Sequence, residues 1–130
     1  MSSDDREELV LEDESEAYTL FNRGMALLAD HHPGQAAMLL AQAAQLEPAK
    51  MSIREGLARA EFALGRFEQA AEHFRLMIET APDNDYAQFC LGRCLFKLGK
   101  PAQARAHLRL ARALNPASEV YREALEALAE

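Results

Sequence analysis

The sequence contains no apolar run that approaches the roughly 18 residues needed to cross a membrane, so we expect no membrane partner. β-Branched residues never alternate with polar ones, and strands are therefore not expected. Residues 1–5 include two acids and no base, unlike a secretory signal or a transit peptide. Only two of the 130 residues are cysteines, without disulfide-style spacing, which favours a reducing compartment. Together these absences predict a helical, cytoplasmic protein.

Groups that perform catalysis or hold cofactors are also sparse. Cys90 and Cys94 are four residues apart and share a helix face, but a zinc site needs four ligands, so packing is the preferred interpretation. His31 and His32 fall in a predicted exposed turn, where the alternative is an adventitious metal. His107 has no evident group to orient it and no nearby nucleophile. With no glycine-rich phosphate loop either, the sequence predicts no enzyme, no catalytic residue, no cofactor and no metal site.

Charge is distributed unevenly along the chain. The formal net charge is −7, and residues 1–16 alone contain eight acids and one base. The other 114 residues contain 13 acids and 13 bases, whereas residues 85–118 contain six bases and one acid. The chain therefore has an acidic N-terminal segment and a basic later segment. Its acidic total argues against nucleic acid as a partner.

The strongest signal is a 34-residue period. Pro48, Pro82 and Pro116 are 34 residues apart, and three alanines repeat with the same step. Periods of this length mark a solenoid, in which one supersecondary unit cannot bury its apolar face alone. The predicted organisation is an acidic tail over 1–16 and a repeat domain over 17–130, with repeats 17–50, 51–84 and 85–118 and a capping helix over 119–130.

Each repeat splits into two helical patterns joined by a turn. Gly65 and Gly99 lie where a helix ends and a positive φ is favourable. Small residues recur where the two helices must approach closely, and a large residue in each second helix is expected to pack against them. The small residues are Gly24, Ala58 and Gly92 in the first helices and Ala36, Ala70 and Ala104 in the second; the large ones are Leu40, Phe74 and Leu108.

These residues resemble the tetratricopeptide repeat (TPR) family, whose pattern has small residues at these positions, a large residue in the second helix and a proline near the end of the repeat. The resemblance covers residues 17–118 without an insertion. It implies an all-α fold, a right-handed α-solenoid of three helix-turn-helix repeats with a C-terminal capping helix.

Repeat 2 departs from the family pattern. The family's early aromatic position is occupied by Leu20, Arg54 and Gln88, and Glu61 also stands at a usually apolar place. Two interpretations remain open for repeat 2. Phe62 rotates inward to fill the gap, or Arg54 and Glu61 form a local polar pair.

The resemblance implies that a peptide or helix binds along a concave face lined by the first helices of the repeats. Aromatic residues, Met and Arg are enriched at such interfaces, and six of the nine aromatic residues belong to the predicted groove. The alternative is that several of these side chains only pack between neighbouring helices. Some relatives use a Lys, Asn and Arg clamp for terminal carboxylates, which we do not expect because Met25 replaces its Asn. The predicted groove residues are Tyr18, Phe21, Asn22, Met25, Arg59, Phe62, Tyr86, Phe89, Arg93, Phe96 and Lys97.

We therefore expect a non-catalytic protein–protein interaction module, adaptor or chaperone-like, that binds an apolar, partly acidic peptide or helix. The alternative is a self-associating structural oligomer, such as a homodimer, that uses the groove or the acidic tail. Residues 7–14 are apolar with flanking acids, which complements a groove containing Arg59, Arg93 and Lys97. They either occupy the groove, in cis or from a second copy, or form a solvated end or an extra helical turn.

Overall fold

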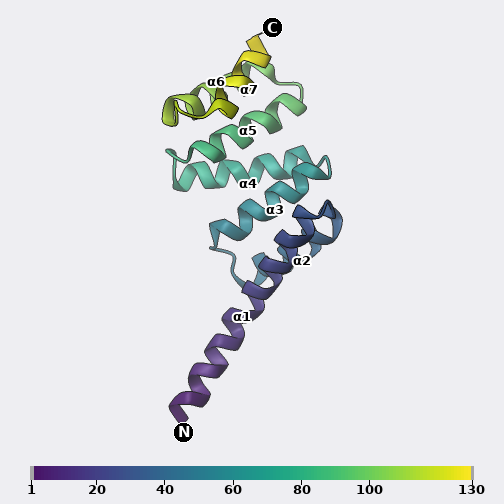
Figure 1. The fold of residues 1–130 in the computed structure, drawn as a ribbon, viewed down its shortest axis with the longest axis vertical. Helices are drawn as coiled ribbons and strands as arrows, with labels where there is room; N and C mark the ends of the chain where they lie inside the picture. Colours follow the sequence, from purple (N-terminus) through teal and green to yellow (C-terminus); the bar gives the residue numbers. More distant parts are fainter. Residues whose placement is uncertain (1, 130) are drawn as a thin grey trace. The chain divides into compact units, whose positions relative to one another are not determined.

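A computed structural model describes the backbone of residues 2–129 and the side chains of residues 16–128. All the regular structure within residues 2–129 is helical, which confirms the predicted all-α fold (Figure 1). The helices are α1 (Ser2–Ala29), α2 (Pro33–Leu46), α3 (Met51–Ala63), α4 (Phe67–Thr80), α5 (Asp85–Lys97), α6 (Pro101–Leu114) and α7 (Glu119–Ala129).

The helix boundaries follow the sequence period. The helices α3, α5 and α7 begin at Met51, Asp85 and Glu119, which are 34 residues apart. The same step separates the starts of α2, α4 and α6. Proline occupies the first turn of α2 and of α6, where its missing N–H costs no hydrogen bond. The capping helix α7 is thus in register with the first helix of each repeat.

The chain divides into two compact units, Met1–Leu64 and Gly65–Glu130. The first unit contains α1, α2 and α3, and the second contains α4 to α7. The boundary falls inside the predicted second repeat, between its two helices. Each unit has its own packed interior and is described separately below.

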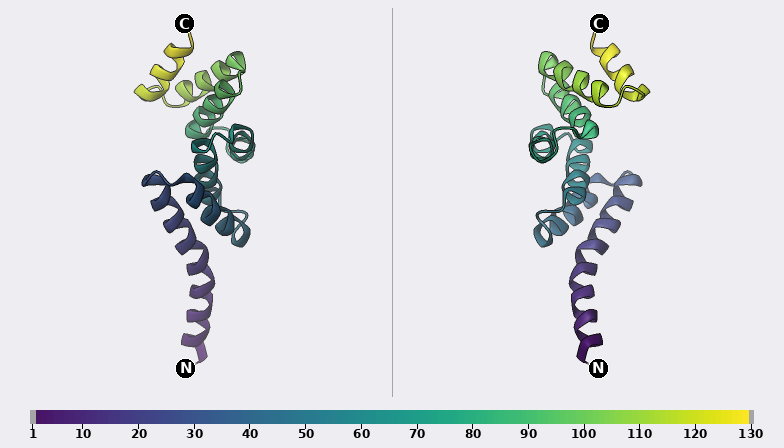
Figure 2. Two further views of the ribbon diagram at one scale, coloured as in Figure 1. Left: turned by 90° about the vertical axis from the view of Figure 1, so that its right-hand side faces the viewer. Right: turned by 90° about the vertical axis from the view of Figure 1, so that its left-hand side faces the viewer.

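Helix α1 has 28 residues, whereas α2 has 14 and α3 has 13. Its N-terminal half therefore extends beyond the two helices against which it packs, as both views in Figure 2 show. The predicted tail, residues 1–16, continues α1 as helix from Ser2. The side chains of residues 1–15 lie outside the described part, so the hypothesis that they occupy a groove stays a prediction.

A small residue facing a large one sets the spacing of α1 and α2. Leu40 and Ala36 are completely buried, and Leu40 lies against Gly24 of α1. A Cβ atom added to Gly24 would be 2.7 Å from Leu40 Cγ, closer than a carbon contact allows. The predicted close approach of the first two helices is therefore confirmed.

The second unit repeats this arrangement between α5 and α6. A Cβ atom on Gly92 would be 3.0 Å from Leu108 Cγ and 3.2 Å from the backbone oxygen of Ala104. Leu108 is 2% exposed, and Phe74, the equivalent residue of α4, is 1% exposed. The large residue predicted for each repeat is therefore at the centre of its packing.

The turns within the repeats share one backbone conformation, but not one residue type. Gly65 and Gly99 both have φ +78°, as predicted, and the equivalent residue of the first repeat is His31, with φ +64°. At both His31 and Gly99 the helix ends in a Schellman motif. The His32 N–H donates to Leu27 O at 2.8 Å, and the corresponding distance after Gly99 is 2.9 Å. The structure therefore requires a left-handed residue at His31, where a side chain is strained.

The close contact at Gly24 makes a testable prediction. Gly24→Ala should lower the free energy of unfolding by about 1–3 kcal/mol, because the new methyl group forces Leu40 from its position. The matched control is Gly34→Ala in α2, because no atom lies within 4 Å of a Cβ atom there. Chemical denaturation monitored by circular dichroism would measure both, and equal stabilities would contradict the packing argument.

The strained turn makes a second prediction, of opposite sign. His31→Gly should raise the free energy of unfolding by about 0.5–1 kcal/mol, since the relief of the left-handed strain exceeds the entropy cost of glycine. The reverse change, Gly65→Ala, should lower it by about 1 kcal/mol. Thermal melts of the two variants beside the wild type test this, and a destabilised His31→Gly protein would refute it.

Candidate functional site

The candidate site lies in the second unit and depends on the position of α7. Tyr121 of α7 is 7% exposed, and its hydroxyl donates a hydrogen bond of 2.8 Å to Asp85 Oδ2 at the start of α5. Asn115 Nδ2 donates to the same oxygen at 3.3 Å. The hydrogen bond from Tyr121, and to a smaller extent that from Asn115, holds the pKa of Asp85 below its usual value. Burial and the hydrogen bond to the Asp85 carboxylate raise the pKa of Tyr121. A charge-assisted bond therefore fixes α7 to α5.

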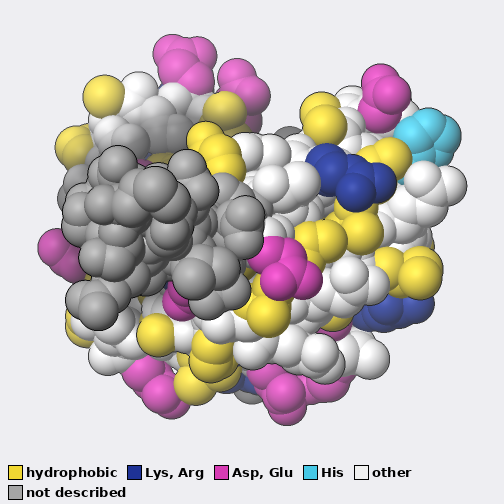
Figure 3. All heavy atoms as spheres, turned by 90° about the horizontal axis from the view of Figure 1, so that it is seen from below, with side chains coloured by type: hydrophobic (Ala, Val, Ile, Leu, Met, Phe, Trp, Pro, Cys, Tyr) yellow, Lys and Arg dark blue, Asp and Glu magenta, His cyan; other side chains and the backbone are white. Residues whose placement is uncertain are grey.

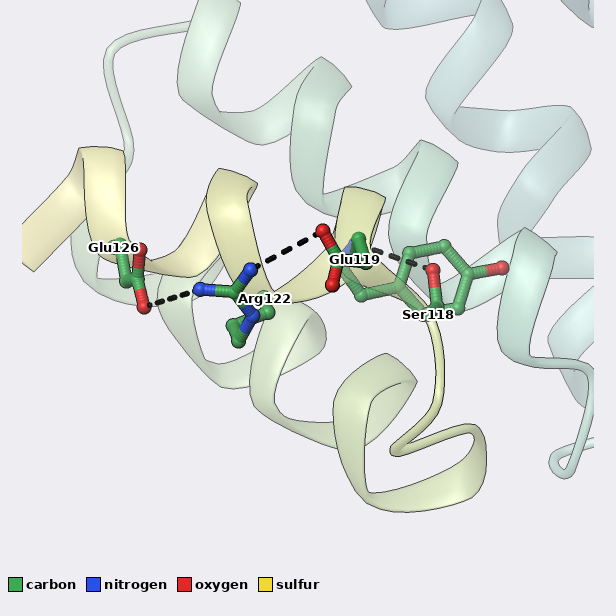
Figure 4. Close-up of polar contacts among 5 residues, drawn as sticks. Ser118, Glu119, Arg122 and Glu126 are labelled. Atoms are coloured by element: carbon green, nitrogen blue, oxygen red, sulfur yellow. Dashed lines mark hydrogen bonds and ion pairs between the residues drawn. The ribbon is translucent and has the colours of Figure 1, made fainter.

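Local interactions make α7 a regular helix from its first turn. The Ser118 hydroxyl caps the helix by accepting a hydrogen bond of 3.3 Å from the Tyr121 N–H. Arg122 forms ion pairs with Glu119 at 3.3 Å and Glu126 at 3.1 Å (Figure 4). Such exposed pairs contribute only a few tenths of a kcal/mol each. They hold the helix in shape, whereas the Tyr121 bond fixes its place.

An aromatic cluster lies beneath this contact. The Phe89 ring centroid is 4.9 Å from that of Tyr121 and 6.5 Å from that of Tyr86. The guanidinium carbon of Arg93 lies 5.6 Å from the Phe89 centroid, within range of a cation–π contact. Phe89 is 8% exposed, so this predicted groove residue supports the site from below rather than lining its surface.

An apolar pocket of about 160 Å³ opens between α5, α6 and α7. Three of the predicted groove residues line it, namely Arg93, Phe96 and Lys97, and all three are exposed, Phe96 by 50%. The lining surface is almost entirely hydrocarbon, and Arg93 and Lys97 are the two charged residues that contribute to it. The remaining lining residues are Gly92, Leu108, Ala124, Ala127 and Leu128. This combination is suited to an apolar side chain with carboxylates beside it.

The groove residues of the first unit lie on α1 and α3. Phe21 and Met25 are half-buried and pack against α3, since a Cβ atom on Gly56 would be 2.8 Å from Met25 Sδ and 3.6 Å from Phe21 Cε1. Tyr18 is 67% exposed. Of the others, Asn22 and Arg59 are exposed and Phe62 is half-buried. Helix packing therefore accounts for part of this set, and Tyr18 is its most accessible aromatic side chain.

Exposed apolar side chains lie among charged ones over the surface. Figure 3 shows hydrophobic side chains (yellow) beside both acidic (magenta) and basic (dark blue) ones on the face that it presents. The pocket is distinguished by its concavity and by a lining that includes Phe96 and two basic residues, Arg93 and Lys97, not by apolar character alone. We therefore take it as the candidate site.

Sequence reasoning did not include the part of the pocket wall that α7 contributes. Ala124 and Leu128 belong to the apolar face of that helix, which the sequence pattern assigns to covering the last repeat. Ala127, also in the wall, is exposed. The sequence feature that could have indicated this wall is the small size of Ala124 and Ala127, which leaves space between α7 and α5.

Gln88 is a buried polar residue with a well-defined set of partners. Its Nε2 donates to Pro82 O at 3.2 Å, and its Oε1 lies 2.7 Å from His107 Nδ1. Because an amide oxygen can only accept, His107 donates this bond in the tautomer that carries its proton on Nδ1. The expectation that no group orients His107 is therefore wrong. Burial, with a smaller contribution from Arg75, lowers the pKa of His107.

The equivalent residue of repeat 2 makes an equivalent bond. Arg54 Nη2 donates to Pro48 O at 3.3 Å, and both residues lie 34 positions before Gln88 and Pro82. Polar side chains at the family's early aromatic position thus bond to the carbonyl of the preceding repeat's proline. Glu61 is 8% exposed and Phe62 is half-buried, and the two interpretations of repeat 2 stay open.

The two cysteines are buried in α5. Cys90 is 5% exposed and Cys94 is completely buried, and burial raises the pKa of Cys94 to about 12. A thiol in this environment is protonated and inert at neutral pH. Within the described part of the chain, no group of three or more His, Cys, Asp or Glu residues is placed to hold a metal. No helix there is both long enough and apolar enough to cross a bilayer.

Comparison with known proteins shows the family. The sequence matches the tetratricopeptide repeat family over residues 27–89 and 62–128, and the chain therefore belongs to it. Its helices fit three repeats of this solenoid fold and a capping helix, as predicted. No curated protein matches the chain in sequence.

Solved structures of similar fold are TPR domains and related proteins. The Sgt2 TPR domain from Aspergillus fumigatus is 26% identical, with a TM-score of 0.79 over 87% of this chain and 76% of that one. The second TPR domain of human RPAP3, in complex with the HSP70 peptide SGPTIEEVD, is 16% identical, with a TM-score of 0.81 over 91% and 98%. PcrH from Pseudomonas aeruginosa is 20% identical, with a TM-score of 0.80 over 90% and 94%.

The bond between Tyr121 and Asp85 predicts a pH-dependent stability. Because the folded-state pKa of Asp85 is lowered, its contribution is present above the unfolded value of about 3.9 and is lost as the pH falls through the folded one. Because the pKa of Tyr121 is raised, its contribution is lost as the pH rises past about 10. Tyr121→Phe should therefore lower the free energy of unfolding by about 1 kcal/mol at pH 7 and by less below pH 4.

Urea denaturation at several pH values measures this difference. The control is Tyr18→Phe, which removes the same hydroxyl group from a side chain that is 67% exposed. A cost for Tyr121→Phe that stays constant from pH 3 to pH 8 would contradict the assignment of the bond.

Proposed function

We propose that the protein is a non-catalytic protein-binding module, adaptor or chaperone-like, that takes an apolar and partly acidic segment of its partner into the pocket between α5, α6 and α7. The observation that carries this proposal is the combination of an apolar interior with the exposed cations of Arg93 and Lys97. TPR domains of similar fold that bind peptides support the general class.

The size and charge of the pocket define the ligand. An apolar cavity of about 150 Å³ in a protein holds one benzene-sized group, so a pocket of about 160 Å³ suits a single aliphatic side chain or a small aromatic one. Exposed Phe96 provides a surface on which the partner's backbone can pack. Carboxylates on either side of the anchor would be attracted by Arg93 and Lys97, which adds specificity and a faster association rate.

Two further observations are consistent with such a ligand. The peptide bound by the second TPR domain of human RPAP3, SGPTIEEVD, combines aliphatic residues with acids. In the first unit, considered by itself, exposed Tyr18 and Arg59 offer a separate surface for contacts with a partner. We place the protein in the cytoplasm. We assign no role to nucleic acid, since the net charge of the chain is −7.

Random-peptide display on the full-length protein tests the proposal. We expect enriched peptides that contain one or two large apolar residues next to Asp or Glu. Lys97→Glu should weaken binding of a selected peptide by about tenfold, because one rim cation becomes an anion. The control is Lys100→Glu, which changes the net charge equally but lies outside the pocket lining. No enrichment, or equal effects of the two variants, would refute the proposal.

A further inference from the structure

We propose that the pocket between α5, α6 and α7 binds residues 7–14 of a second copy of this chain, so that the protein assembles by exchange of its N-terminal segments. This inference rests on the proposed function, because it uses the same pocket. It identifies the occupant as a segment of the protein itself. Sequence, charge and helix geometry each contribute to the argument.

The charges of the segment and of the pocket's surroundings are complementary. Residues 1–16 contain eight acids and one base, whereas residues 85–118, which form α5 and α6, contain six bases and one acid. Arg93 and Lys97 belong to that basic region and line the pocket. Opposite charges of this size steer the two molecules together and make the free energy of association more favourable.

The apolar residues of the segment also match the pocket. Residues 9–11 are Leu-Val-Leu, flanked on both sides by acids. In a helix, Leu11 has Glu7 and Glu8 at i−4 and i−3, and Glu14 at i+3. A segment whose sequence places one aliphatic residue among acids at helical spacing is the ligand that an apolar pocket lined by Arg93 and Lys97 is suited to receive. Residues 2–29 form one helix, so this spacing applies.

The continuity of α1 favours a second copy over the same chain. The helix runs from Ser2 to Ala29 without a break, and its N-terminal half extends beyond α2 and α3 (Figure 1). As part of this helix, the segment can dock on another molecule in the conformation that it already has. Docking on its own chain as a separate tail would break α1 and lose its hydrogen bonds. A preformed helix loses less conformational entropy on binding.

Exchange between two copies is self-limiting. Each chain contributes one segment and one pocket, so two reciprocal contacts close a dimer with two-fold symmetry. Once the first contact forms, the second becomes intramolecular and benefits from a high effective concentration. Modest individual contacts therefore suffice for a stable dimer.

Light scattering of the full-length protein over a hundredfold dilution tests the inference. We expect a wild-type dimer that dissociates on dilution. Leu11→Asp should raise the dissociation constant at least about tenfold, because it removes the apolar anchor. Lys97→Glu should have a similar effect, and Lys100→Glu should not. A monomeric wild type, or a dimer insensitive to Leu11→Asp, would overturn the inference.

A mixing experiment separates this contact from other modes of association. Leu11→Asp protein retains an intact pocket, and Lys97→Glu protein retains an intact segment. Each should be mainly monomeric alone, and the mixture should form a heterodimer through one segment–pocket contact. Absence of the heterodimer would overturn the inference. Stronger binding of a display-selected peptide by Leu11→Asp protein than by wild type, at a concentration at which both are monomeric, would indicate docking in cis and would also overturn it.

The two proposals fail in different ways. If the wild type is monomeric but a display-selected peptide binds and is weakened by Lys97→Glu, the inferred occupant is wrong and the proposed function stands. If neither self-association nor peptide binding depends on Lys97, both are wrong.

Discussion

The close contact between a glycine of one helix and a leucine of the next is the constraint on which the rest of this structure depends. Leu40 against Gly24, and Leu108 against Gly92, bring the helix axes near enough for the remaining side chains to interdigitate. The two contacts are 68 residues apart, which is twice the 34-residue step that separates the starts of equivalent helices. Side chains that do not take part in this packing are free to form a binding surface. Phe96 and Lys97 are of this kind, since they follow Gly92 by about one turn of α5 but are exposed.

How much the sequence reveals depends on whether an interaction follows the 34-residue period. The helix pairs and the contacts of Leu40 and Leu108 are predictable, because periodicity places small and large residues at equivalent positions. The Gln88–His107 bond joins residues 19 apart, and the Tyr121–Asp85 bond joins residues 36 apart. Such pairs carry no local pattern, and their geometry exists only once the helices are packed.

The candidate site illustrates the same limit. The sequence places Arg93, Phe96 and Lys97 on one helix, and the structure adds the opposite wall from α7. Phe89 has the same residue type as Phe96 and follows the same pattern, but Tyr121 covers it. Which of these two aromatic side chains reaches solvent is decided by a helix that begins more than twenty residues after Phe96. The sequence pattern therefore identifies the candidate residues, and packing decides which of their side chains reach solvent.

The pocket forms where α7 packs as the capping helix. Helix α7 is in register with α3 and α5, as the first helix of a further repeat would be. The position equivalent to Gly92 is Glu126, 34 residues later, whose side chain is 62% exposed and pairs with Arg122. Among the described residues no second helix packs a large side chain against Glu126, and a glutamate is therefore tolerated there. Ala124 and Ala127 are likewise free to be small, which leaves the space beside Phe96 unfilled. The packing constraint that operates within the repeats is thus relaxed at the capping helix, and this relaxation leaves room for the candidate binding pocket.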